Sequence, residues 1–280
     1  MKKFLAVVMT AVLAMSMMTA CGSSKSSKEN KDTTAAKAET IDASEVTLVS
    51  DGVLTVGAEM GYAPFETLQK DGKTPEGFDI DIITEIAKRL GLKVNFINTS
   101  FDGILGKIGK DYDVVCSAVT INPTRKKAVL FSTPYITNYQ TVVVKKGSDL
   151  KINSLKDLDG KSVGVQKGTT SDQLMSEYKS TKTINVEVAA NDKLLNCFTQ
   201  LTNGEINAVV VDSTVADGFV AKNPDKYEKA FSDKTEPEEF GIAIGKNNAK
   251  LQEAINKALE QMDKDGFLKD TADYWFSSQE

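Results

Sequence analysis

Arg125 is the residue whose type and surroundings offer the most specific chemistry. The segment that holds it runs from Cys116 to Ile136, CSAVTINPTRKKAVLFSTPYI, and opens with an apolar run that predicts a strand. Asn122 then fits an N-cap, and Pro123 fits the first helical position, where a missing N–H costs nothing. Arg125 therefore belongs to the first helical turn, near the Thr120 hydroxyl. A guanidinium in that place can hold a carboxylate through paired charge-assisted hydrogen bonds.

The same basic segment also has a plainer interpretation. Arg125, Lys126 and Lys127 are consecutive, and a run of charges at a helix start is usually a solvated face. The spacing alone favours this solvated face, and a carboxylate-binding arginine is the sharper hypothesis.

Other polar groups also follow predicted strands. Glu59 ends the strand LTVGAE, and Asp212 ends INAVVVD, where it either faces a cleft or caps the helix STVADGFVAK. Thr169 and Thr170 open the helix TTSDQLMSEY directly after Gly168. Exposed N–H groups at a helix N-terminus can bind an anion, and simple N-capping by threonine is the alternative.

For these residues to form one site, the fold must bring the ends of several strands together. From Val53 the order is strand, turn-rich loop, a helix over residues 78–90 that ends at Gly91, and the alternating strand LKVNFIN. Phe101 opens a short helix, and YDVVCSAVT is the next strand. This rhythm predicts a parallel sheet covered by helices, in which ligands bind outside the carboxyl ends of the strands. One rim of that sheet then collects Glu59, Phe101, Ala118 and Thr120.

A second α/β unit begins with the strand TVVVKK after Tyr139 and continues through SVGVQ, NVEVAA and INAVVV. The chain then returns through EEFGIAI to a terminal helix pair. One apolar stripe of that pair consists of Leu251, Ile255, Ala258, Leu259 and Met262. Trp275 and Phe276 are expected to dock on the first unit rather than bind ligand.

Five segments in this order resemble the polar amino-acid-binding family of solute-binding proteins that serve ABC importers. They are GYAPFE (61–66), GFDIDIITEIAKRLG (77–91), SAVTINPTRKKAVLFSTPY (117–135), GVQKGTTS (164–171) and AVVVDS (208–213). The resemblance implies an α/β fold of the type II periplasmic-binding-protein kind, with two lobes, each a sheet flanked by helices, joined by a two-strand hinge. Such lobes can close around a ligand.

The resemblance also assigns roles within the cleft. Arg125, Thr120 and Thr170 hold the α-carboxylate of an amino acid, and Asp212 pairs with its ammonium. Tyr62 and Phe101 sandwich the ligand side chain, while Glu59 and Asp79 help set the polarity of its site. The remaining ligand-binding positions are Ala118, Thr169 and Gln166. Without the resemblance, Phe101 reads as core packing, Tyr62 as a loop anchor, and Asp79 as a helix-start carboxylate.

The N-terminus predicts export. Residues 1–20 combine Lys2 and Lys3 with an apolar run and small residues, which is typical of a signal peptide. MTACG at residues 18–22 resembles a lipobox and implies cleavage before Cys21 and lipidation of that cysteine. Residues 21–44 form a polar tether, because their composition cannot bury enough surface. The predicted lobes are 45–136 with 239–280 (lobe 1) and 141–233 (lobe 2).

The composition excludes several classes of site. The 280-residue chain has no histidine, which removes Ser-His-Asp sites and histidine-ligated metals, and we expect no cofactor or metal. Cys116 and Cys197 lie in apolar stretches and are expected to be buried free thiols. A net charge of −5 without basic stripes argues against nucleic acid as a partner.

The sequence therefore predicts a monomeric, non-enzymatic importer subunit that captures an L-amino acid and delivers it to an ABC permease with its ATPase subunits. Glu59 favours a basic ligand such as arginine, lysine or histidine, and glutamine or cystine is the alternative. A cyclohexadienyl-dehydratase-like enzyme, with Glu59 as general acid, is a rival on the same fold. A partner of a sensor or adhesion system is another. The expected location is the outer face of a Gram-positive membrane, or the periplasm of a Gram-negative cell.

Overall fold

The computed structural model describes residues 41–276 of the chain. The predicted signal peptide, Cys21 and most of the tether lie outside the described residues. Within them, the predicted end of the tether at residue 44 is wrong. Ile41 is buried in the core, and its amide donates to the carbonyl of Arg89. The overall polar composition of residues 21–44 predicted a tether, but Ile41 within it packs into the core of the first lobe.

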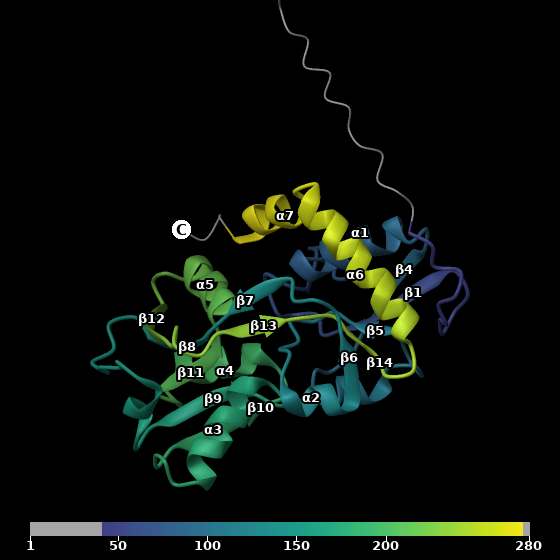
Figure 1. The fold of residues 1–280 in the computed structure, drawn as a ribbon. Coiled ribbons are helices and arrows are strands. Elements are labelled where there is room, and N and C mark those ends of the chain that lie inside the picture. The colour runs from purple at the N-terminus through teal and green to yellow at the C-terminus, as the bar shows by residue number, and fades with distance from the viewer. Residues whose placement is uncertain (1–40, 277–280) are drawn as a thin grey trace, which may run out of the picture. The chain divides into compact units, whose positions relative to one another are not determined.

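The first sheet has five strands in the order β4-β1-β5-β14-β6 (Figure 1). Strands β4 and β5 flank β1 in parallel, and β14 is antiparallel to β5 and β6. We call this sheet and its helices the first lobe. Its strands are β1 (Val53–Ala58), β4 (Lys93–Asn98), β5 (Val114–Val115), β6 (Val129–Phe131) and β14 (Ala243–Gly245).

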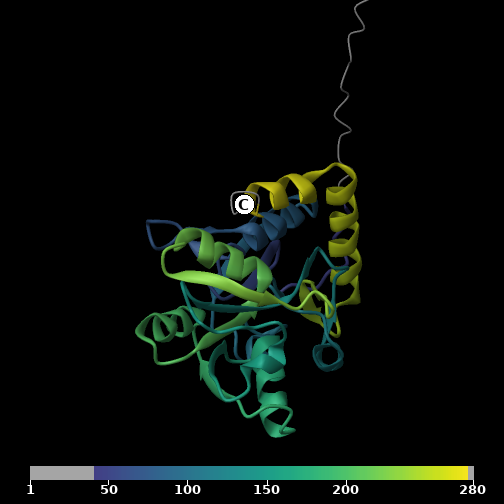
Figure 2. The ribbon, with the colours of Figure 1, turned by 90° about the vertical axis from the view of Figure 1, so that its left-hand side faces the viewer.

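The helices of the first lobe bury the predicted apolar faces. Figures 1 and 2 both show the C-terminal pair beside α1. The stripe from Leu251 to Met262 and the face of α1 around Ile83 and Ile86 are buried, as predicted. These helices are α1 (Phe78–Arg89), the 3-10 helix η1 (Ile104–Lys107), α2 (Pro123–Ala128), α6 (Ala249–Lys264) and α7 (Phe267–Phe276).

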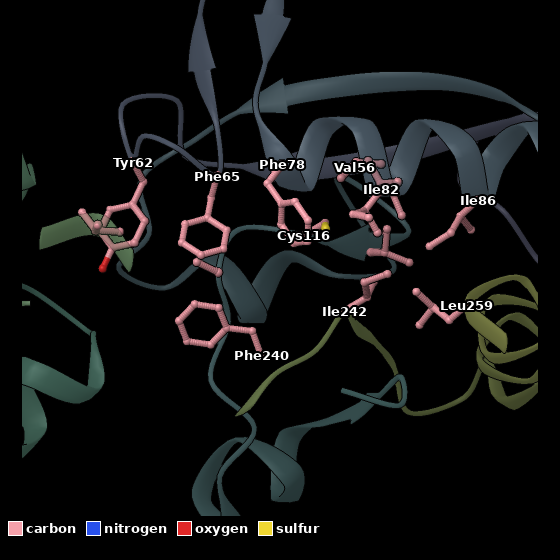
Figure 3. Packing of buried hydrophobic residues seen from close by; sticks show 14 of the residues in the cluster. Val56, Tyr62, Phe65, Phe78, Ile82, Ile86, Cys116, Phe240, Ile242 and Leu259 are labelled. Carbon is pink, nitrogen blue, oxygen red and sulfur yellow. The ribbon is translucent and has the colours of Figure 1, made fainter. Parts of the chain in front are cut away.

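A row of aromatic rings connects the start of α1 to the loop after β1. Figure 3 shows Tyr62, Phe65 and Phe78 in sequence along this row, and the ring of Phe276 lies 4.9 Å from that of Phe78. The indole of Trp275 donates to Asp81, with Nε1 and Oδ2 2.7 Å apart. The predicted docking of the C-terminal aromatic residues on the first lobe is therefore confirmed.

The second sheet also has five strands, in the order β10-β9-β11-β8-β12. We call it, with its helices, the second lobe. Its strands are β8 (Gln140–Lys145), β9 (Ser162–Gln166), β10 (Glu187–Asn191), β11 (Ala208–Asp212) and β12 (Tyr227–Ser232). Its helices are η2 (Leu155–Leu158), α3 (Thr170–Ser180), α4 (Leu194–Asn203) and α5 (Ser213–Lys222).

Two antiparallel strands run between the sheets (Figure 1). They are β7 (Ile136–Asn138) and β13 (Glu238–Phe240), which pair with each other. The two remaining strands form a small hairpin, β2 (Thr67–Leu68) with β3 (Pro75–Glu76).

Two predicted strands are shorter than the sequence suggested. Of YDVVCSAVT, only Val114–Val115 is a named strand, because the chain turns out of the sheet and Ala118 adopts a positive φ of 47°. EEFGIAI divides into β13 and β14, with Gly241 and Ile242 between them. After Ala118 the chain stays in the first lobe and continues into α2 and β6, and the second interruption lies where the backbone passes from the β7–β13 pair into the first sheet.

Candidate functional site

Residues from both lobes line one cavity with an empty volume of about 300 Å³. Its first-lobe residues follow the carboxyl ends of strands, and its second-lobe residues follow β9 and end β11. Every predicted ligand-binding residue except Asp79 lines it, and Glu66 lines it without having been predicted. The lining residues are Glu59, Tyr62, Glu66, Phe101, Ala118, Thr120, Arg125, Gln166, Thr169, Thr170 and Asp212.

Arg125 is buried in this cavity, in contrast to the exposed Lys126 and Lys127. The solvated-face interpretation therefore fails for Arg125. The Asn122 side chain accepts from the backbone N–H of Arg125 at 2.8 Å, as the predicted N-cap requires. Nη1 of Arg125 donates to the Thr120 carbonyl oxygen at 2.9 Å, and Nη2 donates to the Gly168 carbonyl oxygen in the second lobe at 3.0 Å.

Two neighbours further define the surroundings of Arg125. Its guanidinium carbon lies 5.6 Å from the centre of the Phe101 ring, a cation–π geometry. Burial lowers the pKa of Arg125, and the carboxylates of Asp212 and Glu238 act in the opposite direction. The guanidinium thus remains a positive charge inside a mostly acidic site.

Asp212 supplies the acidic counterpart from the end of β11. It occupies the N-cap position of α5 but makes no side-chain capping bond. Its carboxylate instead accepts from the Tyr62 hydroxyl, from Asn138 Nδ2 at 2.6 Å and from Gln140 Nε2 at 3.4 Å. Of the two alternatives left by the sequence, the cleft-facing one is correct. Burial, followed by repulsion from Glu238, raises the pKa of Asp212 from 3.8 to about 7.

The threonines at the start of α3 behave differently from each other. Thr169 caps the helix, since its hydroxyl accepts from the Asp172 N–H at 3.2 Å. The Thr170 hydroxyl donates to Glu238 Oε2 at 2.8 Å, and Thr120 donates to the same oxygen at 2.8 Å. Glu238 thus receives hydroxyl donors from both lobes. Sequence reasoning missed it, because nothing in the acidic run EPEE distinguishes the one carboxylate that faces the site.

Glu59 is already paired within the protein. Its Oε1 lies 3.1 Å from Lys193 Nζ and accepts from Gln166 Nε2 at 2.9 Å, while Oε2 accepts from the Phe101 N–H at 2.5 Å. Lys193 therefore offsets the negative charge that the sequence assigned to a basic ligand.

Asp79 acts behind the cavity. It is fully buried, and its Oδ2 accepts from the Ala118 N–H at 2.7 Å and from the Tyr135 hydroxyl at 3.1 Å. This bond holds Ala118 in its positive φ. The structure places Asp79 where it orients the backbone of a lining residue.

Glu66 is the lining residue that the sequence left without a role, although it ends the motif GYAPFE. It is fully buried, and its Oε1 accepts from the Ser117 hydroxyl at 2.7 Å. Among the described residues, its Oε2 has no hydrogen-bond partner. An acidic residue directly after an apolar Pro-Phe pair was the available clue.

Residues 41–276 contain no group of three or more histidine, cysteine, aspartate or glutamate side chains placed to hold a metal. Their cysteines, Cys116 and Cys197, are both buried and free. No helix within this range is long and apolar enough to span a bilayer. What the arrangement does offer is a pair of buried charges of opposite sign, Arg125 and Asp212, on two lobes that face one cavity.

Comparison with known proteins gives a match over most of the chain. The family model described as bacterial extracellular solute-binding proteins, family 3, matches residues 54–278. The L-cystine-binding protein TcyJ of Escherichia coli (strain K12) is 36% identical over 231 residues, which cover 81% of this chain and 84% of that protein.

The chain is also similar to solved structures of amino-acid-binding proteins. An ancestral arginine-binding protein bound to arginine is 43% identical, with a TM-score of 0.76, over 80% of this chain and 98% of that one. The ancestral amino acid-binding protein AncCDT-1, a precursor of cyclohexadienyl dehydratase, is 37% identical, with a TM-score of 0.73, over 80% of this chain and 96% of that one.

Proposed function

Because the chain belongs to the bacterial extracellular solute-binding proteins of family 3, we propose that it is the substrate-binding subunit of an amino acid ABC importer. Its fold is the two-lobed type II periplasmic-binding-protein fold, as expected. In this role the chain binds its ligand between the lobes and presents it to a permease. The permease and its ATPase subunits are part of the proposal.

One observation carries this proposal, namely that buried Arg125 and buried Asp212 line the same cavity from opposite lobes. An amino acid presents a carboxylate and an ammonium on neighbouring atoms, which match these two charges. An unpaired charge in a buried site costs several kcal/mol, so a zwitterion is favoured over a ligand with one charge. A micromolar dissociation constant needs only about 8 kcal/mol net.

Arg125 and the N–H groups at the start of α3 hold the α-carboxylate in this proposal, with Thr120 and Thr170 beside them. Asp212 holds the α-ammonium. Tyr62 and Phe101 contact the ligand side chain from the first lobe, and Gln166 contacts it from the second. The burial of Arg125, Asp212, Thr120, Tyr62 and Gln166 supports the assignment.

A basic side chain is the favoured ligand. Of the acidic lining residues, Asp212 meets the α-ammonium and Glu59 is paired with Lys193, which leaves Glu66 for a ligand side chain. The arginine-bound ancestral protein, at 43% identity, supports the same class. A polar neutral amino acid is the second ligand class, supported by the likeness to the cystine-binding protein of Escherichia coli.

We also propose that the protein binds its ligand without catalysing a reaction. The alternative is a dehydratase activity, because the chain is similar to a precursor of cyclohexadienyl dehydratase. The one acid suggested for such chemistry, Glu59, is engaged by Lys193, Gln166 and the Phe101 N–H. A general acid needs a proton to give and access to the reacting atom. The engagement of Glu59 therefore supports the binding role.

Membership in this family places the function outside the cytoplasm. We add the proposal that Cys21 carries lipid after removal of residues 1–20, which anchors the protein on the outer face of a membrane. Several acyl chains give stable anchoring, since each buried CH₂ contributes about 0.8 kcal/mol.

A thermal-shift panel on residues 41–280 tests the function. The protein is stripped of ligand by unfolding and refolding, then tested with the twenty L-amino acids, ornithine, cystine and prephenate. A ligand at a hundred times its dissociation constant stabilises by about 2.7 kcal/mol, which moves the midpoint by several degrees. Shifts with amino acids support the binding role. No shift with any amino acid overturns it, as does turnover of prephenate in a separate activity assay of the same protein.

A further inference from the structure

The loop that carries Glu66 is fixed by its backbone. The Glu66 carbonyl accepts from the N–H groups of Gly61 and Tyr62 at 3.0 and 2.9 Å. The same loop is tied to the start of α1, where the Phe78 N–H donates to the Pro64 carbonyl at 2.9 Å. Glu66 is therefore held against the cavity by bonds at both ends of the loop.

The carboxyl group of Glu66 has capacity that the protein leaves unused. One oxygen accepts from Ser117, and the other has no partner among the described residues, although the side chain is fully buried and lines the cavity. A buried polar atom without a partner carries a desolvation cost. A group on the ligand that binds this oxygen removes that cost.

The neighbouring acids leave Glu66 as the group suited to meet a cation. Glu59 is paired with Lys193 and makes two further bonds. Asp212 lies at the other lobe, bound to Tyr62 and Asn138. Asp79 also has an oxygen, Oδ1, without a partner among the described residues, but Asp79 does not line the cavity. A second positive charge on the ligand, beyond the α-ammonium, is thus matched best by Glu66.

We propose that Glu66 selects a positively charged ligand side chain through its Oε2 oxygen and releases one proton to solvent when that side chain binds. The inference rests on the proposed amino-acid-binding function and names the residue that sets the ligand class within it. The step forms an ion pair between the Glu66 carboxylate and the ligand cation, and breaks the O–H bond of the Glu66 acid.

The charges around Glu66 support the proton release. Burial, followed by repulsion from Asp79 on α1, raises the pKa of Glu66 well above its usual value, and Glu59 and Asp212 act in the same direction. Only the Ser117 hydrogen bond lowers it. The facing Tyr62, Tyr135 and Cys116 all have pKa values raised by burial, so they add no charge near neutral pH. These surroundings favour the neutral acid of Glu66, and a cation placed beside it favours the carboxylate.

Calorimetric titration with L-arginine and L-citrulline tests the proposal, because citrulline is a neutral analogue of nearly the same shape. Each titration is run in two buffers of different ionisation enthalpy, which gives the number of protons released. Both ligands carry the α-ammonium that faces Asp212, so the difference between their proton counts isolates the side-chain site. We expect arginine to release about one proton more than citrulline near neutral pH, and its affinity to rise with pH.

The variant Glu66→Gln keeps an acceptor for Ser117 and removes the charge. We expect it to bind arginine at least tenfold more weakly than wild type, to bind citrulline within about twofold of wild type, and to lose the extra proton. Glu187→Gln, on the exposed side of β10, is the control and should match wild type.

The outcomes separate the two proposals. Wild-type protein that binds arginine with no extra proton released, or binds only neutral amino acids, overturns the role of Glu66 and leaves the importer function intact. An unchanged affinity of Glu66→Gln for arginine also overturns the role of Glu66 and leaves the importer function intact. Wild-type protein that binds no amino acid overturns the proposed function itself. If Glu66→Gln fails to fold, the wild-type proton count still decides.

Discussion

The hydroxyl of Thr170, in the second lobe, donates a 2.8 Å hydrogen bond to the carboxylate of Glu238, on a strand that joins the lobes. Thr120 of the first lobe donates to the same oxygen, and Gln140 donates to the other at 3.0 Å. A carboxylate of the protein thus occupies hydroxyl donors on both sides of the cavity. Its charge also acts on Asp212, whose pKa it raises.

Glu238→Gln should therefore change the pH dependence of binding. The affinity for a neutral amino acid is expected to fall as the pH drops through about 7, where Asp212 takes up a proton and can no longer pair with an ammonium. Without the charge of Glu238, the pKa of Asp212 is lower, and this fall should begin at a lower pH. Titrations with a neutral ligand between pH 5 and 9 measure the midpoint. An unmoved midpoint contradicts the coupling.

Asp212→Asn should weaken the binding of every amino acid ligand at least tenfold, which corresponds to about 1.4 kcal/mol. The amide keeps an acceptor for Tyr62 and has lost the charge that balances the ammonium. Isothermal titration with the ligand found in the thermal-shift panel gives the change. Asp225→Asn, on the exposed surface after α5, is the control. Equal affinities in the two variants would remove Asp212 from the ligand site.

Arg125→Lys should also reduce affinity at least tenfold. The guanidinium reaches the carbonyls of Thr120 and Gly168 and still has N–H donors for a carboxylate, whereas an ammonium cannot make this fork. The exposed Lys127→Arg provides the matched control. The same titration applies, and wild-type affinity in Arg125→Lys would favour a purely structural role for the arginine.

The stability of the ligand-free protein should decrease as the pH rises from about 4 to 8. Burial raises the pKa values of Asp79 and Asp212 from 3.8 to about 7 in the folded state. Between these values the folded state binds more protons than the unfolded state, so the free energy of unfolding falls by up to about 1.4 kcal/mol per pH unit for each group. Urea titrations at several pH values measure it. Asp79→Asn should flatten the dependence, and a free energy that rises over this interval contradicts the assignment.

Gly77→Ala should destabilise the protein and disturb the Glu66 loop. Gly77 has φ near +140°, and an added Cβ would lie 2.1 Å from the Phe65 carbonyl oxygen. Gly72 also has a positive φ, near +67°, with nothing within 4 Å of such a carbon. Gly72→Ala should cost about 1 kcal/mol from backbone strain alone, and Gly77→Ala clearly more. Thermal unfolding compares the two, and equal losses would show that the contact with Phe65 is unimportant.

Local sequence was sufficient for most elements of the fold. Proline and asparagine at the start of α2, the apolar stripes of α1 and α6, and the alternation of β4 depend on neighbours within a few residues, so they could be read directly. The positions of Glu59, Phe101, Ala118 and Thr120 at the cavity were also predictable, since strand ends in a parallel sheet share one edge, whereas Glu66 was missed. The limits of β5 and the division of EEFGIAI could not be predicted. The point at which the backbone leaves a sheet depends on contacts with residues far away in the sequence.

The sequence by itself predicted alternating α/β units, and its resemblance to the solute-binding family implied the two lobes and the pairing of Arg125 and Asp212 with a zwitterion. Only the tertiary structure decided which role each acidic residue at the cavity has. Glu59 is paired with Lys193, Asp79 holds the Ala118 backbone, Glu238 accepts from both lobes, and Glu66 keeps an oxygen unpaired. The physical reason is that the charge and the hydrogen-bonding capacity of a carboxylate depend on burial and on partners far along the chain, such as Thr120 for Glu238, 118 positions away.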